Sequence, residues 1–523
     1  MQDDVPTPSS AAGPRPRRGA ASATPPVAVG AALLARSASQ TLAEQLAGHY
    51  AARIRQRLLL PGARLPSVRE SARRHRVSPS TVVAAYDQLL AQGLVEAKRQ
   101  RGFFVRDGDM MTPRTPPAAP EPQPAATRQA ITTETALRLD APLRPPPVDA
   151  TALIRGMFAV DTQRPAPGLG TLPAEWLDAA MLQTALRRVM APAKSASATH
   201  LPSSYLSYGE PAGDTRLRHA LAQRLADFGV PAAPAQIVTA NGATHALDIC
   251  SRALLAPGDA VLVDEPGWSV EFARLTQLGM RLLPVPRGVD GPDLAAMAAL
   301  AKAHQPRLYV TCSVLHNPTG ASLSLASAHQ VLRLAEQHDF RILEDDTYAH
   351  LAPAHAPRLS ALDGLRRTIY VSGFAKILAP GWRVGFMAAP PDLVERLVDV
   401  KLLGTLTTPA LLEQAVAVCL EQGWLRRHAD RVIARLGAAR TRTVKLALAA
   451  GCRFVTPPAG LFGWVDTGVD TERLATDMLD DGWLLAPGTV FHPGRQPSTL
   501  MRINFATTQD PRFWQAFENA RLG

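Results

Sequence analysis

A proline-rich segment in the first third of the chain limits what the chain can fold into. Residues 107–148 contain ten prolines, among them Pro116, Pro117 and the run from Pro145 to Pro147. Proline lacks a backbone N–H and fixes φ, so this segment suits neither a helix interior nor a sheet interior. The chain of 523 residues is also too long for a single core. We therefore predict a linker at 107–148 with separate folding units on its two sides.

The residues before this linker carry most of the net charge. From Arg36 to Arg106 there are 13 Lys or Arg and 4 Asp or Glu, a net of 13 minus 4, or +9, whereas the whole chain has +11. Residues 1–35 are rich in Pro, Ala and Ser, so we expect them to be disordered. The local basic charge indicates a polyanionic partner.

The apolar pattern at 36–106 predicts a winged helix-turn-helix. A second short helix is expected with Ser67 as its cap, and a third begins at Ser78 and ends at Gly93. Residues 94–105 are typical of two short strands around a basic turn. The first helix is expected in residues 41–59, where apolar residues recur about every four: Leu42, Leu46, Tyr50, Ile54 and Leu58. A helix after a tight turn can enter the major groove of DNA, although a basic helical domain with another role remains the alternative.

After the linker, predicted strands alternate with predicted helices. The strand PGDAVLVDEP is followed by the helix EFARLTQLGM and the strand MRLLPV. This alternation is typical of a mainly parallel sheet that helices cover on both faces. Ligands of such sheets bind at the carboxyl ends of the strands.

The segment SGFAKIL, from Ser372 to Leu378, contains one of only six lysines among 56 basic residues. An amine that bonds to the aldehyde of pyridoxal phosphate must lose its proton near neutral pH and lie away from bulk water. Gly373 and Ala375 leave space for such a cofactor, and Arg383 could bind its phosphate. Lys376 is therefore the candidate Schiff-base residue. The alternative is an ordinary surface lysine between a strand and a turn.

Three polar residues nearer the N-terminus offer contacts to the cofactor ring. Asp345 follows the strand-like RILE, and a carboxylate there would keep the pyridine nitrogen protonated. The apolar run LYVTCSVL predicts a strand that ends at His316, where the HNPTG turn begins. Tyr348, three residues after Asp345, and Asn317 in this turn could both donate to the phenolic oxygen of the ring. Two of them also have a simpler interpretation, with Asp345 as a helix cap and Asn317 as a turn residue.

Two further segments suit the phosphate and the face of the ring. Ala243 and Thr244 open an apolar helix directly after a predicted strand, where backbone N–H groups bind phosphate. Trp268 follows a Pro-Gly turn and could stack on the ring, or could be a core residue.

These segments, in this order, make the chain resemble the fold-type I aminotransferases. The resemblance runs from about Ala152 to the C-terminus and is stronger to the aminotransferase-like half of MocR-type GntR regulators. It implies that Lys376 carries the cofactor and that the residues above contact it. It also implies that Tyr208, in YGEPAGDTRLR, reaches the phosphate in the neighbouring subunit of a homodimer, and that Arg502, in LMRINFA, binds a carboxylate.

Residues 41–105 resemble the GntR DNA-binding head through LPSVRE, the VVAAYDQL helix and the RGFFV wing. The positions that the resemblance assigns to DNA contact are Ser67, Arg69, Ser78, Ser80, Thr81, Lys98, Arg99 and Arg101. Many relatives have an arginine directly after the capping serine, where this chain has Pro79, so one contact is expected to be absent.

Composition and the two resemblances together predict four segments: a disordered tail at 1–35, a winged helix-turn-helix at 36–106, a linker at 107–148, and an aminotransferase-like body at 149–523. The body is expected to combine a large, mainly parallel α/β sheet domain with a smaller α+β domain. We expect a transcriptional regulator that binds double-stranded DNA, holds pyridoxal phosphate at Lys376, and senses an amino compound or a B6 vitamer. A catalytically active aminotransferase with an appended head, and a cofactor-free sensor of another ligand, are the alternatives.

The remaining sequence features exclude other classes of site. The four cysteines have no paired metal-ligand spacing, so we expect reduced core residues and no metal. No apolar run approaches the ~18 residues of a membrane span, and the opening residues do not form a signal peptide. A bacterial cytoplasmic protein that associates with the nucleoid when bound to DNA is expected.

Overall fold

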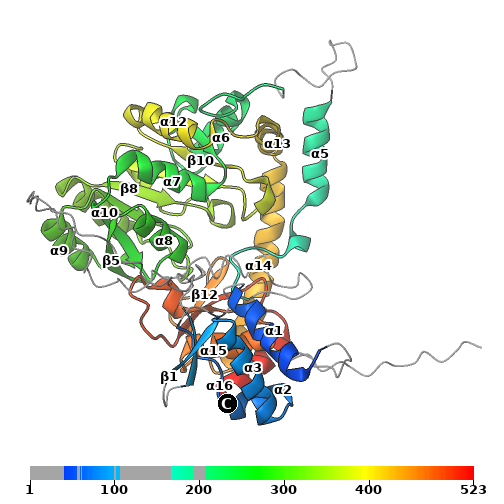
Figure 1. Cartoon of the computed structure of the whole chain (residues 1–523). Coiled ribbons are helices and arrows are strands. Elements are labelled where there is room, and N and C mark those ends of the chain that lie inside the picture. Colours follow the sequence, from blue (N-terminus) through cyan, green and yellow to red (C-terminus); the bar gives the residue numbers. More distant parts are fainter. Residues whose placement is uncertain are drawn as a thin grey trace, which may run out of the picture.

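The computed structural model describes residues 40–55, 59, 62–98, 102–106, 167–191 and 206–522. The predicted disordered tail at 1–35 and the predicted linker at 107–148 lie outside these ranges. We use "head" for the described residues up to 106 and "body" for those from 167 onward. Figure 1 shows the head against the end of the body that contains the C-terminus. None of the described helices has the length and apolarity that a bilayer crossing needs.

The head has the predicted winged helix-turn-helix. Its helices are α1 (Leu42–Arg55), α2 (Val68–His75) and α3 (Pro79–Ala91), and its wing pairs β1 (Val95–Lys98) with β2 (Gly102–Val105) in antiparallel fashion. Ser67 caps α2 by accepting from the Glu70 amide, and Ser78 caps α3 by accepting from the Thr81 amide at 3.1 Å. Both predicted caps are confirmed. The predicted extension of the first helix to Leu58 falls on residues 56–58, outside the described ranges.

An eight-stranded sheet forms the centre of the body. Its order is β3-β10-β9-β8-β7-β4-β5-β6, and β9, β8, β7, β4 and β5 pair in parallel. The strands are β3 (Ile237–Ala240), β4 (Ala260–Glu265), β5 (Arg281–Gly288), β6 (Gly291–Pro292), β7 (Leu308–Thr311), β8 (Arg341–Asp345), β9 (Thr368–Gly373) and β10 (Gly385–Ala388). The predicted mainly parallel sheet is confirmed, although β10 runs antiparallel to both of its neighbours.

Helices cover both faces of this sheet, as the alternating pattern predicts. On one face α7 (Ala243–Leu254), α8 (Ser269–Gln277) and α12 (Pro391–Thr405) contribute to one apolar core, and on the other α9 (Leu294–His304), α10 (Leu325–Gln337) and α11 (Leu359–Asp363) contribute to a second. Short turns of 3-10 helix lie at η4 (Pro234–Gln236), η5 (Ala349–Leu351) and η6 (Pro380–Trp382). Burial of apolar side chains on both faces is the main stabilising contribution to such a layered domain.

One predicted strand ends earlier than its sequence indicates. The apolar run LYVTCSVL predicts a strand up to His316, whereas β7 ends at Thr311. The chain leaves the sheet because the Ser313 hydroxyl bonds to Glu344 and Leu315 adopts a positive φ of 51°. His316 then donates its amide to the Ala321 carbonyl at 2.8 Å, which closes a loop over the sheet edge.

A smaller α+β part completes the body, as predicted. Its four-stranded antiparallel sheet has the order β11-β12-β14-β13, with β11 (Arg453–Phe454), β12 (Phe462–Asp466), β13 (Ala486–Pro487) and β14 (Leu500–Asn504). The remaining elements are η2 (Ala174–Trp176), α5 (Ala179–Met190), α6 (Thr215–Asp227), α13 (Ala410–Glu421), α14 (Trp424–Ala449), α15 (Thr471–Asp480), η7 (Gly488–Phe491) and α16 (Pro511–Leu522). In Figure 1 the head lies beside α15, to which Arg53 and Arg74 of the head bond.

Candidate functional site

Most of the predicted cofactor residues lie at the carboxyl ends of the strands of the large sheet. Asp345 is the last residue of β8, Lys376 follows β9, and Ala243 opens α7 after β3. Asn317 lies in the loop after β7, and Trp268 is the N-cap of α8 after β4. The parallel strands therefore direct segments that are distant in sequence to the same edge of the sheet.

Lys376 has the electrostatic environment that a reactive amine requires. Its side chain is half-buried, and burial lowers the pKa of the amine to about 8, with Arg502 and Arg383 acting in the same direction. Asp345 opposes them and raises this pKa. A lowered pKa gives a useful fraction of neutral, nucleophilic amine near neutral pH.

Asp345 is a carboxylate that burial destabilises. Burial raises its pKa to about 6, and the negative charges of Glu271 and Asp346 add to the effect. Thr347 opposes it by donating its hydroxyl to Asp345 Oδ1 at 2.6 Å and its amide at 3.1 Å. A cation placed beside Asp345 would relieve this cost, and a protonated pyridine nitrogen is such a cation.

Arg502 is a buried guanidinium with only neutral acceptors. Its Nη1 donates to Asn317 Oδ1 at 2.7 Å and its Nη2 to the Gly168 carbonyl at 2.6 Å, and no carboxylate in the described ranges forms an ion pair with it. Its Nε has no partner in the part of the chain that the structure describes. The rings of Phe462 and Phe491 lie 4.5 and 5.1 Å from the guanidinium carbon. Burial lowers its pKa to about 10, so an incoming carboxylate would be stabilised here.

Asn317 and Tyr348 retain neutral donors. Because Asn317 Oδ1 accepts from Arg502, the amide Nδ2 of Asn317 remains as the donor that the sequence predicts. Tyr348 is buried edge-on against Phe462, and its hydroxyl bonds to none of the described residues. Burial raises the pKa of Tyr348, so its hydroxyl keeps its proton.

The start of α7 forms a narrow cradle between glycines. Arg383 donates Nη2 to the Asn241 carbonyl at 2.9 Å, beside Gly242. A Cβ on Gly242 would lie 2.5 Å from this guanidinium, and a Cβ on Gly385 would lie 2.6 Å from the Ala243 amide nitrogen. The helix N-terminus, including Ala243 and Thr244, and an arginine thus converge, which suits a phosphate dianion. The side chains and backbone present here fit pyridoxal phosphate.

Sequence reasoning missed the residues that enclose Arg502. Gly168 accepts from the guanidinium through its carbonyl, and a Cβ on Gly170 would lie 3.7 Å from Nη1. Phe462 and Phe491 flank it. No motif marks these four residues, because their common feature is a contact across the fold.

The side chain of Tyr208 is 79% exposed in the single chain. Leu206, two residues earlier, is exposed as well, and so are Leu403 in the last turn of α12 and Leu406 at its C-cap.

The predicted DNA-contacting residues that the structure describes are accessible on the head. Arg69, Ser78 and Ser80 are exposed, and Thr81 is half-buried. The Ser78 hydroxyl lies 2.7 Å from that of Ser80 and 2.8 Å from that of Thr81, so three hydroxyls form a hydrogen-bonded cluster at the start of α3. Lys98 lies on β1, 3.0 Å from Glu96. Ser67 is exposed at the start of α2, whereas Arg99 and Arg101 lie outside the described ranges.

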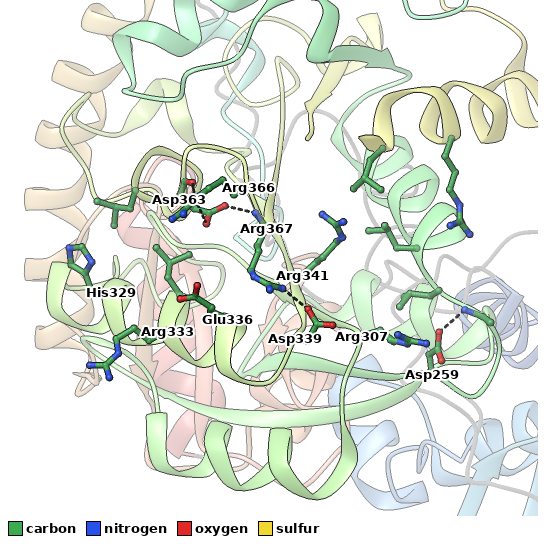
Figure 2. A pocket seen from close by; sticks show the side chains of 17 residues that line it. Asp259, Arg307, His329, Arg333, Glu336, Asp339, Arg341, Asp363, Arg366 and Arg367 are labelled. Carbon is green, nitrogen blue, oxygen red and sulfur yellow. Dashed lines mark hydrogen bonds and ion pairs between the residues drawn. The ribbon is translucent and has the colours of Figure 1, made fainter. Parts of the chain in front are cut away.

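A separate cavity of about 1090 Å³ lies at the opposite edge of the large sheet (Figure 2). Arg341 opens β8, and Arg307 and Arg367 directly precede β7 and β9, so these side chains gather where the strands begin. Arg367 is paired with Asp339 at 2.7 Å and Arg341 with Asp392 at 3.3 Å. This cavity therefore has no part in the site at the carboxyl ends of the strands.

The chain matches two known families. Residues 178–517 match the model of aminotransferase class I and II, and residues 42–105 match the model of bacterial regulatory proteins of the gntR family. The uncharacterized HTH-type transcriptional regulator YisV of Bacillus subtilis is 25% identical over 86% of this chain and 89% of its own. The probable rhizopine catabolism regulatory protein MocR of Rhizobium meliloti is 29% identical over 75% of this chain and 72% of its own.

The chain is also similar to solved structures of aminotransferases. The crystal structure of LysN, an α-aminoadipate aminotransferase of Thermus thermophilus in complex with N-(5'-phosphopyridoxyl)-L-leucine, superposes with a TM-score of 0.63. It is 24% identical and covers 70% of this chain and 94% of its own. This likeness shows a shared fold.

Proposed function

Because the chain belongs to the aminotransferase class I and II family and carries a gntR-type head, we propose that it is a MocR-type transcriptional regulator that uses pyridoxal phosphate to sense an amino compound or a B6 vitamer. The observation that carries the proposal is the position of Lys376, which follows β9 half-buried at the same edge of the sheet as Asp345 and the start of α7. Burial and the charges of Arg502 and Arg383 lower the pKa of its amine. The aminotransferase-like body follows a DNA-binding head in the same chain, and this order favours sensing over metabolism as the main role.

The residues at the carboxyl edge of the sheet would hold the cofactor. Pyridoxal phosphate supplies an aldehyde that bonds reversibly to amines. The Lys376 amine would form that bond, since its lowered pKa leaves a fraction of it neutral near pH 7. Asp345 would hold a proton on the pyridine nitrogen. The amide of Asn317 and the hydroxyl of Tyr348 would donate to the phenolic oxygen.

The remaining contacts would fix the phosphate and the ring. Arg383, with Ala243 and Thr244 at the start of α7, would bind the phosphate, because a cation and a helix N-terminus both favour a dianion. Trp268 would lie on the ring.

Arg502 would bind the carboxylate of the effector. Its guanidinium is buried among neutral acceptors and aromatic rings, so a carboxylate would gain a charge-assisted bond with little competition from water. An effector that carries both an amine and a carboxylate, such as an amino acid, would meet Lys376 and Arg502 together.

A homodimer would complete the site. We infer that Tyr208 contacts the phosphate bound by the partner subunit, since its side chain is exposed, as is that of Leu206 two residues earlier. The two heads of the dimer would bind two half-sites of an operator in double-stranded DNA, in a bacterial cytoplasm.

A catalytically active aminotransferase is the second candidate. The groups that transamination requires are present, namely Lys376, Asp345, Tyr348 and Arg502. The two functions are separated by measuring keto acid release from a panel of amino acids with the loaded protein. Turnover at rates typical of enzymes, about 1 per second or more, would favour the enzyme.

The regulator function is tested by DNA binding. The loaded full-length protein should bind a duplex that it selects from a random pool, and the Lys376→Ala variant should bind that duplex with a changed response to added pyridoxal phosphate. A full-length protein that binds no duplex, whether loaded or not, would contradict the proposal.

A further inference from the structure

The head contacts the body at the C-terminal turn of α15 (Figure 1). Arg74 of α2 forms an ion pair with Asp477 Oδ1 at 3.3 Å and donates a second bond to the Asp477 carbonyl at 2.6 Å. Arg53 of α1 donates to the Leu479 carbonyl at 3.0 Å. Two cations of the head therefore meet the carbonyl end of one helix of the body, where the helix dipole favours positive charge.

The same turn leads directly into the strand beside Arg502. After α15 the chain turns at Gly482 and enters β13, where Ala486 pairs with Arg502 of β14. On the way, the Leu484 carbonyl accepts from the Gly168 amide at 2.7 Å. The Gly168 carbonyl in turn accepts from Arg502 Nη2 at 2.6 Å. The head and Arg502 thus hold the two ends of one short segment.

The connection between these ends is tight. A Cβ on Gly168 would lie 2.5 Å from the Leu485 carbonyl carbon, so the two backbones are in close contact. Close-packed contacts of this kind can transmit a displacement, because a backbone that shifts on one side meets the backbone on the other. A shift of Gly168 would therefore press on the segment after α15.

The ion pair between head and body is partly exposed and partly desolvated. Burial raises the pKa of Asp477 and Glu70 acts in the same direction, whereas Arg74 acts to lower it. The side chains of Arg74 and Asp477 are 20% and 24% exposed. Partly exposed pairs contribute little to stability, which suits a contact that opens and closes.

We propose that the C-terminal turn of α15 is the docking site of the head, and that an anion bound at Arg502 changes this docking through Gly168 and β13. The anion would take over a bond that Arg502 gives to the Gly168 carbonyl, and the segment from Leu479 to Ala486 would shift. Arg69 stays exposed while Arg74 is docked, so docking sets the orientation of the head without covering its predicted DNA contacts. This inference rests on the proposed function for its signal and its output.

Hydrogen exchange of the full-length protein tests the docking. Asp477→Ala removes the ion pair, and Glu472→Ala is the matched control, because Glu472 lies at the other end of α15 and pairs with Arg495 of the body. Alanine favours helix, so both variants keep α15. We expect the amides of α1 and α2 to exchange about threefold to tenfold faster in Asp477→Ala, and at wild-type rates in the control. Wild-type rates in Asp477→Ala would overturn the docking site.

The link to Arg502 is tested in the same assay. Arg502→Leu should speed exchange at 481–485 and in α1 and α2, whereas Arg453→Leu, an exposed arginine of the same sheet, should not. Unchanged exchange in the Arg502→Leu variant would overturn the transmission, whether or not DNA or cofactor binds.

DNA binding then separates this inference from the proposed function. With maleate as the carboxylate probe, the affinity of the loaded wild type for its selected duplex should change by about fivefold or more, and that of Asp477→Ala by less than about twofold. Equal responses in both would refute α15 as the route while the regulator function stands. A wild type that binds neither cofactor nor duplex would contradict the function, and the exchange results would still decide the docking.

Discussion

The pH dependence of cofactor capture follows from the surroundings of Lys376. Burial, Arg502 and Arg383 bring the pKa of its amine from 10.5 to about 8. Because only the neutral amine attacks the aldehyde, the capture rate should rise about tenfold per pH unit below pH 8 and level off above it. At pH 7 the neutral fraction is about 300-fold larger than for an amine with a pKa of 10.5.

Replacing Arg502 by leucine should move this profile in a known direction. Leucine keeps the site apolar but removes the positive charge, which is the second cause of the lowered pKa after burial. The pH at which the capture rate levels off, which we call the bend, should shift upward by about one unit, and capture at pH 7 should slow about tenfold. Arg453→Leu, which removes an exposed arginine of the same sheet, should leave the profile unchanged.

Stopped-flow absorbance after adding a limiting amount of pyridoxal phosphate to the cofactor-free protein measures this profile. A wild-type bend near pH 10 would mean that the pKa of the Lys376 amine is not lowered, which would refute its proposed environment. Identical profiles for the wild type and Arg502→Leu would mean that the charge of Arg502 does not act on the amine.

Other perturbations have defined outcomes. Asp345→Asn should move the bend in capture below pH 8, because Asp345 raises the pKa of Lys376; a bend at higher pH in the same kinetics would contradict this sign. Lys376→Met should raise the free energy of unfolding of the cofactor-free protein, measured in urea, by up to about 3 kcal/mol below pH 8, because burial destabilises the charged amine. This gain should shrink as the pH rises from 8 toward 10.5. Lys98→Ala should lower the salt slope of DNA binding by about one and weaken all sequences alike; a loss confined to one duplex would exclude a phosphate contact. Ser78→Ala should destabilise the head by about 1 kcal/mol through the lost cap, and an unchanged melting temperature of the head would speak against it.

Much of the fold could be predicted because local signals agree with the final structure. Ser67 and Ser78 cap the helices that their positions predict, and the alternation of apolar strands and amphipathic helices predicts a sheet with both faces covered. The prediction that the strand continues to His316 was wrong, because the apolar residues after Thr311 are buried in a loop. An apolar pattern alone cannot distinguish a buried loop from a buried strand.

The site was predictable where it depends on single residues and unpredictable where it depends on contacts. Lys376, Asp345 and Asn317 stand in recognisable segments at strand ends, whereas Gly168 and Phe491 meet Arg502 only after the chain has folded. The contact of Arg74 with Asp477 joins residues that are 403 positions apart, and no local pattern indicates such a pair.

Borohydride reduction followed by peptide mapping tests whether pyridoxal phosphate attaches covalently to Lys376. Trypsin does not cut at a modified lysine, so the adduct should lie on the peptide from Thr368 to Arg383. We expect a pyridoxyl adduct on this peptide in the wild type and none in Lys376→Ala. An unmodified peptide ending at Lys376, recovered in full from the reduced wild type, would contradict the account.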